Sequence, residues 1–288
     1  MKIVMIYPNI RKIDTAEAFR EIYALLRERN AKVIAPYWAA KFINSSDVEF
    51  YSVEECVKIS DFIIVLGGDG TILRIAKEAA EYRIPIIGIN YGHLGFVTEL
   101  ESSDIKMIHR IFDGNYYLDK RIMLDVCVFR DDAKIFTSTA LNDVILTNGT
   151  MFKIIKVQIY ADGVPVSAFR GDGVVISTPT GSTAYSIAAG GPVVEPTSEN
   201  ISVTPICAHE VQAKAYVFSS DRKITVKAKS YSDKNAYLSV DGRETIEIFP
   251  DDIIRIQRSG YETKLIRVKR QSIYHVIREK LSGGGNVS

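Results

Sequence analysis

The order of apolar and polar residues along the chain changes its character near residue 115. Before that point, short apolar runs alternate with segments in which apolar residues recur every three or four positions. Consecutive apolar residues are typical of strands buried on both faces, and the longer spacing is typical of one helix face. The runs cover residues 2–7, 31–36, 62–66 and 85–90, and a helical stripe of Phe19, Ile22, Tyr23 and Leu26 follows the candidate caps Asp14 and Thr15. This alternation predicts an α/β domain with a mostly parallel sheet over residues 1–115.

Beyond residue 115 single apolar residues alternate with polar ones, which is the period of a half-buried strand. The predicted strands cover residues 124–129, 153–160, 223–228 and 252–258, and the dipeptides Asp162-Gly163, Asp241-Gly242 and Ser259-Gly260 are predicted turns. We therefore expect a β-rich, sandwich-like domain over residues 116–271. A short amphipathic helix over residues 272–281 is expected to pack back onto the first domain.

Composition and charge exclude two classes of partner. A hydrophobic content of 47% with 25% charged residues is that of a soluble globular protein. The net charge of +1 argues against a large non-specific nucleic-acid surface. No apolar run reaches the ~18 residues of a membrane span, and the first residues do not form a signal peptide. We expect neither nucleic acid nor a membrane as a partner.

The three cysteines, Cys56, Cys127 and Cys207, are far apart in the chain. Their spacing fits neither a disulfide framework nor a zinc site, so we expect them to serve as small buried apolar side chains. This usage predicts a reducing compartment, most simply the cytoplasm.

The strand over residues 62–66 runs into the turn Gly67-Gly68-Asp69-Gly70-Thr71, after which a helical pattern begins. Glycine lets the backbone adopt positive φ and lets a phosphate approach closely, and the N–H groups at the start of the helix, with Thr71 as its candidate cap, favour an anion. Asp69 repels phosphate, so its presence indicates proton abstraction from a hydroxyl or metal binding. An ordinary strand-to-helix turn with a capping aspartate is the alternative.

A second patch follows a predicted buried strand over residues 174–176. Ser182 and Thr183 are candidate caps of a short helix through residue 189, which the sequence Gly190-Gly191-Pro192 ends. The hydroxyl and N–H groups of this patch suit a diphosphate or a ribose, and Tyr185 can stack on a ring. A structural turn is the alternative.

A third patch is Asn142-Asp143, inside a stretch that otherwise looks like a strand. Neighbouring residues of a strand face opposite sides, so at least one of the two points toward the core or a cleft. An asparagine can read an adenine edge, and an aspartate can accept hydrogen bonds from ribose hydroxyls. A turn or bulge is an equal alternative.

The chain lacks a P-loop, a G-x-G-x-x-G turn, the protein-kinase motifs, H-E-x-x-H and C-x-x-C, so no dedicated metal site is predicted. Taken together, the three patches resemble those of the NAD kinases, which use ATP or polyphosphate. The resemblance covers residues 62–242 and includes the loop 89–96 and the run 170–191, which separates it from lipid and sugar kinases with related glycine turns. Many bacterial relatives have Glu where this chain has Asp143.

The resemblance implies phosphoryl transfer from ATP or polyphosphate to the 2′-hydroxyl of the adenosine ribose of NAD, giving NADP. It implies that Asp69 accepts the hydroxyl proton and that Mg²⁺ arrives with the phosphoryl donor. Commonly the family forms homodimers or homotetramers. The other implied substrate-binding residues are Gly68, Gly70, Thr71, Phe96, Asn142, Asp143, Arg170, Asp172, Thr183, Ala184 and Tyr185, with Arg170 and Asp172 completing a pocket from a neighbouring subunit.

Two other functions fit part of the sequence. A diacylglycerol-type lipid kinase would share the glycine turn, but the chain shows no amphipathic membrane helix. A non-enzymatic dinucleotide sensor would keep the fold, but simple binding gains nothing from the Asp69 carboxylate beside a phosphate.

Overall fold

A computed structural model of the chain describes residues 1–9, 15–43, 47–92, 95–149, 154–230, 236–269 and 277. Contacts between residues divide the chain into two compact units, Met1–Lys120 with Thr263–Ser288, and Arg121–Glu262. The sequence pattern assigned residues 116–271 to the β-rich domain, whereas the contacts group residues 116–120 and 263–269 with the first unit. The expected helix over residues 272–281 lies outside the described residues, apart from Ile277.

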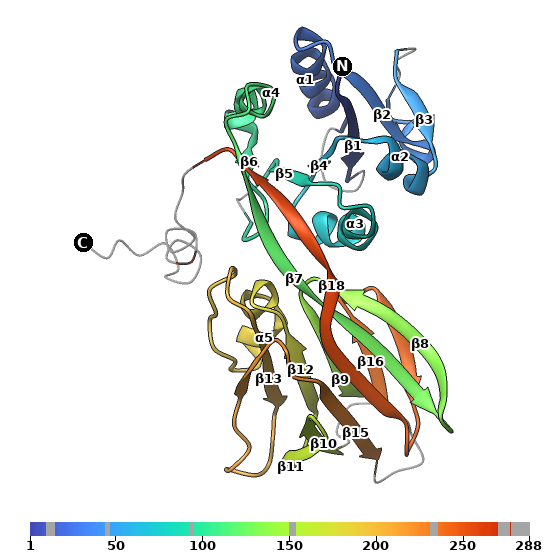
Figure 1. Ribbon diagram of the computed structural model, residues 1–288, viewed down its shortest axis with the longest axis vertical. Coiled ribbons are helices and arrows are strands. Elements are labelled where there is room, and N and C mark those ends of the chain that lie inside the picture. The colour runs from blue at the N-terminus through green and yellow to red at the C-terminus, as the bar shows by residue number, and fades with distance from the viewer. Residues whose placement is uncertain are drawn as a thin grey trace, which may run out of the picture. The chain divides into compact units, whose positions relative to one another are not determined.

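The first unit is built on a parallel sheet with the strand order β3–β2–β1–β4–β5 (Figure 1). The short strand β6 and the last part of β18 both pair with β5. Its elements are β1 (Ile3–Pro8), α1 (Thr15–Glu28), β2 (Lys32–Pro36), η1 (Tyr37–Ala39), β3 (Glu49–Tyr51), α2 (Val53–Ile59), β4 (Phe62–Leu66), α3 (Asp69–Glu81), β5 (Ile86–Asn90), β6 (Leu100–Glu101), η2 (Ser102–Ile108), α4 (His109–Phe112) and the end of β18 (Ile253–Arg267). The expected α/β domain with a mostly parallel sheet is confirmed.

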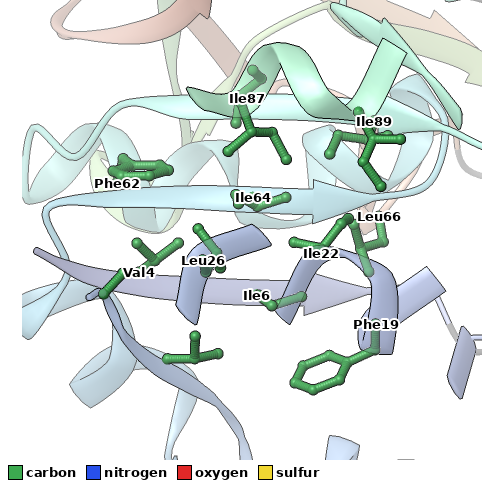
Figure 2. Close-up of a cluster of buried hydrophobic side chains, with 14 of the residues drawn as sticks. Val4, Ile6, Phe19, Ile22, Leu26, Phe62, Ile64, Leu66, Ile87 and Ile89 are labelled. Carbon is green, nitrogen blue, oxygen red and sulfur yellow. The ribbon is translucent and has the colours of Figure 1, made fainter. Parts of the chain in front are cut away.

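Helices cover both faces of this sheet. Val4 and Ile6 of β1 belong to the same apolar cluster as the α1 side chains, and Figure 2 shows Phe19, Ile22 and Leu26 of α1 beside them. The next residue along β1, Met5, packs instead with α2 and α3 residues. Because both faces are buried, the strands need apolar residues at every position, which explains the continuous runs in the sequence. Each fully buried side chain of this size stabilises the fold by about 1.5–3 kcal/mol.

The second unit consists of two antiparallel sheets. Their strand orders are β11–β10–β15–β18–β7–β8 and β14–β13–β12–β9–β16–β17 (Figure 1). The elements are β7 (Tyr117–Arg130), β8 (Ala133–Ala140), β9 (Asp143–Asn148), β10 (Ile155–Ala161), β11 (Val164–Gly171), β12 (Gly173–Ser177), η3 (Thr180–Thr183), α5 (Tyr185–Ala188), β13 (Asn200–Ile206), β14 (Tyr216–Ser219), β15 (Ile224–Ser230), β16 (Ala236–Val240), β17 (Glu244–Ile248) and β18. One apolar cluster takes side chains from both sheets, so this unit is the expected β-rich sandwich.

Two of the three predicted turns are present. Asp162-Gly163 and Asp241-Gly242 both have two successive positive φ angles, as a tight hairpin turn requires. Ser259-Gly260 was expected to be a turn but lies inside β18. Neither of its residues has positive φ, so the backbone does not form the predicted turn.

The cysteines differ in burial, although all three are free thiols. Cys56 is buried as expected, Cys127 is half-buried and Cys207 is exposed. The expectation was therefore wrong for Cys207, whose thiol is hydrogen-bonded to the Asp172 carboxylate, and this contact raises the pKa of the thiol. Among the described residues, no helix is long and apolar enough to cross a membrane.

Candidate functional site

The glycine-rich turn joins β4 to α3 in the first unit. The helix begins at Asp69, with Gly68 as its N-cap residue, so the expected cap Thr71 already lies inside the helix. Thr71 is buried, and its hydroxyl accepts a hydrogen bond from the Asn9 side-chain amide at 3.1 Å. Gly67 has a φ of 150°, and a Cβ there would overlap the Thr71 hydroxyl. A Cβ on Gly70 would have no other described residue within 4 Å outside its own helix turn, so no contact among the described residues explains that glycine.

The Asp69 carboxylate holds the segment that follows β5. Its Oδ2 accepts a hydrogen bond from the Phe96 N–H at 2.8 Å, and its Oδ1 accepts from the N–H groups of Val97 and Thr98, both at 3.1 Å. An ionised carboxylate has about four acceptor positions. The described donors occupy three of them, which leaves one position on Oδ2. Asp69 is thus an anchor for the loop that can still accept a hydrogen bond from a hydroxyl.

The loop fits closely around that carboxylate. A Cβ on Gly95 would overlap the Asp69 carboxylate, so this position requires glycine. The Phe96 ring is half-buried against the apolar cluster under α3. The structure therefore brings the predicted residues Gly68, Asp69, Gly70, Thr71 and Phe96 together, whereas residues 93 and 94 of the loop lie outside the described part.

The Asn142-Asp143 patch lies at the start of β9 in the second unit. The strand begins at Asp143, so Asn142 lies in the bend before it rather than inside a strand as expected. The Asp241 carboxylate, in the turn between β16 and β17, accepts hydrogen bonds from the N–H groups of Leu141, Asn142 and Asp143 at 2.8, 2.8 and 3.0 Å. The bend is thus fixed through its backbone, which leaves the two side chains available for other contacts. Among the described residues, the buried Oδ1 of Asn142 has no hydrogen-bond partner.

Asp241 is the site residue that the sequence interpretation missed. The dipeptide Asp241-Gly242 was recognised only as a turn, which it is. Its carboxylate reaches residues about a hundred positions earlier in the chain. The only available signal was the choice of aspartate at this turn, which by itself does not identify the partner.

The loop after β12 packs on the same bend. Thr178 donates its N–H to the Asn142 carbonyl oxygen at 2.9 Å and its hydroxyl to the Leu141 carbonyl oxygen at 2.6 Å. The same hydroxyl accepts the Gly181 N–H at 3.0 Å. A Cβ on Gly181 would overlap the Asn142 carbonyl oxygen, so only glycine allows this close approach.

The short helix α5 begins differently from the prediction. Ala184 is its N-cap residue, and neither Ser182 nor Thr183 caps it. The Ser182 hydroxyl donates to the Pro179 carbonyl oxygen at 2.7 Å, and the Thr183 hydroxyl donates to the Thr180 carbonyl oxygen at 3.4 Å. These local bonds close the turn η3, so the two hydroxyls are not available to α5. Gly190 has a φ of 87°, in agreement with the predicted glycine after the end of the helix.

Asp143 connects the bend to the start of α5. Its carboxylate is 4% exposed and accepts a hydrogen bond from the Tyr185 N–H. Burial and the negative charge of Asp241 raise the pKa of Asp143 to about 7, and the bond from Tyr185 opposes that rise. Tyr185 is 46% exposed, so this carboxylate lies next to an exposed aromatic residue.

Arg170 and Asp172 lie elsewhere in the second unit. The exposed Arg170 forms an ion pair with Glu210 at 2.9 Å. The backbone of Asp172 pairs with that of Asn148 at one end of β9, whereas Asp143 pairs with Ser177 at the other end. At about 3.3 Å per residue, the five residues from 143 to 148 span ~17 Å. Within one chain, Asp172 is therefore not brought to the Asn142-Asp143 patch.

No group of three or more histidine, cysteine, aspartate or glutamate side chains that could hold a metal ion occurs among the described residues.

Two family models match the chain. The model described as the ATP-NAD kinase N-terminal domain matches residues 4–116, and the ATP-NAD kinase C-terminal domain matches residues 141–268. The chain is 38% identical over 288 residues to a NAD kinase of Natranaerobius thermophilus, with all of both chains covered. It is 41% identical over 224 residues to a NAD kinase of Symbiobacterium thermophilum, covering 77% of this chain and 79% of that one.

Two solved structures are similar to this one. The yeast NADH kinase, determined in complex with NADH, has a TM-score of 0.89 at 25% identity, covering 100% of this chain and 89% of that chain. A NAD kinase from Archaeoglobus fulgidus, determined in complex with ATP, has a TM-score of 0.73 at 27% identity, covering 99% and 100%.

Proposed function

The chain belongs to the ATP-NAD kinase family, and on that premise we propose that it transfers a phosphoryl group to the 2′-hydroxyl of the adenosine ribose of NAD, giving NADP. Its relatives are phosphotransferases that the comparisons name NAD kinases. ATP is the proposed donor, with polyphosphate as the alternative. Neither a lipid kinase nor a non-enzymatic sensor receives support from these comparisons.

The observation that carries the proposal is the acceptor position on Oδ2 of Asp69 that the described donors leave open, at a turn whose Gly70 is explained by no contact with other described residues. In the proposed step, the ribose 2′-oxygen forms a bond to the γ-phosphorus while the bond from that phosphorus to the β-phosphate bridging oxygen breaks. The hydroxyl proton passes to Asp69 Oδ2. Positioning and charge neutralisation are the main protein contributions to phosphoryl transfer, and an oriented proton acceptor adds to them. Gly68, Gly70 and Thr71 form the turn that the donor phosphates approach.

The second unit supplies the proposed dinucleotide contacts. The Oδ1 of Asn142, which has no partner among the described residues, suits the amino group of adenine, and the Asp143 carboxylate suits a ribose hydroxyl. The exposed Tyr185 offers a ring for stacking, and the preceding residues Thr183 and Ala184 line the proposed dinucleotide pocket. In the first unit, Phe96 packs on the adenosine in this proposal.

Mg²⁺ enters with the phosphoryl donor in this proposal. Mg²⁺ usually keeps several waters and is held by substrate phosphates with one or two carboxylates. In this proposal water and the donor phosphates would hold the ion, because the one remaining acceptor position of Asp69 is assigned to the ribose hydroxyl. When bound, the ion would neutralise charge on the phosphates.

The proposal includes assembly into a homodimer or homotetramer in which Arg170 and Asp172 serve a neighbouring subunit. The ~17 Å along β9 between Asp143 and the position of Asp172 supports this for Asp172, which is not brought to the patch of its own chain. The assembly is measured by light scattering on a size-exclusion column. We assign the protein to the cytoplasm, which the free thiols of its three cysteines support.

A coupled assay for NADP formation tests the reaction. The purified protein is incubated with NAD, Mg²⁺ and, in separate reactions, ATP, other nucleoside triphosphates or polyphosphate. We expect NADP with at least one donor and none after the metal is chelated. Phosphorylation of a lipid or sugar without NADP formation from any donor would overturn the proposal.

A further inference from the structure

A buried arginine binds the backbone carbonyl groups of the segment whose N–H groups bind Asp69. Arg267 is the last residue of β18 and is 7% exposed. Its Nη1 donates hydrogen bonds to the carbonyl oxygens of Val97 and Thr98 at 3.1 and 3.2 Å. Asp69 Oδ1 accepts the N–H groups of the same two residues. The peptide group between Val97 and Thr98 therefore has its N–H on the Asp69 carboxylate and its carbonyl on the Arg267 guanidinium.

The guanidinium is itself fixed by two carboxylates. Arg267 donates from Nη1 to Glu99 at 3.1 Å and from Nε to Asp119 at 3.0 Å. The second Glu99 oxygen accepts the N–H groups of Val268 and Lys269 at 2.8 and 2.7 Å. Both carboxylate side chains are 8–9% exposed, so each depends on this cation for charge compensation. The arginine thus has one orientation, and that orientation sets the position of the 97–98 peptide group.

We propose that Arg267 is a positioning residue for Asp69. Two of the three bonds that fix the rotation of the Asp69 carboxylate come from Val97 and Thr98, whose carbonyl groups Arg267 holds. By fixing residues 97–98, Arg267 also fixes the direction in which the remaining acceptor position on Asp69 Oδ2 points. The inference rests on the proposed role of Asp69 as proton acceptor. A misplacement of about 1 Å at a reacting group costs up to ~100-fold in rate, so a loosened segment lowers kcat without altering the NAD contacts of the second unit.

The test compares Arg267→Met with the control Arg130→Met. Arg130 likewise pairs with a buried carboxylate, that of Asp252, at 2.7 Å, but it lies in the second unit and contacts none of the proposed site residues among the described ones. We expect Arg267→Met to lower kcat by about 10- to 100-fold with the KM for NAD unchanged. Hydrogen exchange at the amides of residues 96–98 should become faster in this variant and stay unchanged in Arg130→Met.

The results for these variants decide whether Arg267 positions Asp69. A normal kcat in folded Arg267→Met, or an equal loss of kcat in Arg130→Met, would overturn the inference. If Arg267→Met does not fold, Arg267→Lys keeps the charge between Glu99 and Asp119 but lacks the planar fork that spans carbonyls and carboxylates. It should still show faster exchange at residues 96–98 and a reduced kcat. If the wild-type protein makes no NADP, the proposed function fails. Unchanged hydrogen exchange at residues 96–98 in the variants would separately refute the claim that Arg267 holds this segment.

Discussion

Asp241→Asn should weaken the fold of the second unit and shift the titration of Asp143. The carboxylate accepts one N–H at Oδ2, from Leu141, and two at Oδ1, from Asn142 and Asp143. An asparagine has a single acceptor oxygen, so in its better orientation the Leu141 N–H faces an amide N–H₂. One buried donor left without a partner costs about 1–3 kcal/mol, and the other two bonds lose the strengthening effect of a charged acceptor. Removing a buried charge beside Asp143 offsets part of this cost, so we expect the free energy of unfolding to fall by about 1–3 kcal/mol.

The same substitution removes a negative charge next to Asp143. That charge is one of two causes that raise the pKa of Asp143 to about 7, the larger being burial. In Asp241→Asn the pKa of Asp143 should fall but stay above the usual carboxyl range. If the ionised Asp143 accepts a ribose hydroxyl of NAD, the rise in KM for NAD on acidification should begin at a lower pH than in the wild type.

A matched control is available at another turn. Asp162 has the same φ as Asp241, 49°, and is likewise followed by a glycine with positive φ, but its carboxylate is exposed and bonds to Arg222 and Lys223. Asp162→Asn therefore tests asparagine in the same backbone conformation without a buried unpaired donor. Urea unfolding of both variants, with the pH profile of KM for NAD, measures the two effects. Equal stability of the two variants, together with an unchanged pH profile, would refute the reasoning.

Three further outcomes are expected. The free energy of unfolding should fall as the pH rises from the ordinary carboxyl pKa toward about 7, because in this pH range folded Asp143 keeps a proton that the unfolded chain has lost. Unfolding experiments at several pH values measure this slope, and Asp143→Asn should flatten it. Asp69→Asn should lower kcat by about 10²–10⁴-fold while NAD still binds. The variant should also be less stable, because one amide oxygen cannot accept all three loop N–H groups. Near-normal turnover would exclude Asp69 as the proton acceptor. Tyr185→Ala should weaken NAD binding by about 1–3 kcal/mol with little change in melting temperature, because Tyr185 is 46% exposed. A large loss of stability with unchanged KM would assign Tyr185 to the core.

The elements with a local physical cause could be predicted from the sequence. Residues 62–66 form β4 as expected, because a strand buried on both faces requires an uninterrupted apolar run. The glycine turn after it and the end of α5 at Gly190 follow from backbone conformations that glycine adopts easily. The sandwich follows from the two-residue period beyond residue 115.

The contacts that position the candidate site could not be predicted, because they join distant parts of the chain. Asp241 bonds to residues 98–100 positions away, and Arg267 pairs with Glu99 across 168 positions. The residues next to them in the sequence identify Asp241 only as a turn residue and Arg267 only as a strand residue. Likewise, Ser259-Gly260 has the composition of a turn, yet it lies inside β18, a strand whose neighbours come from distant parts of the chain.

Two carboxylates hold loops in the same way, each taking three consecutive backbone N–H groups: Asp69 at residues 96–98 and Asp241 at residues 141–143. Every amino acid except proline has that N–H group, so these anchors do not depend on which side chains the loops carry. Residues such as Phe96 and Asn142 can therefore be exchanged while the loop backbone keeps its course. For engineering, this makes the two loops suitable places to vary ligand preference, with proline as the substitution to leave out and the two aspartates as the positions to keep.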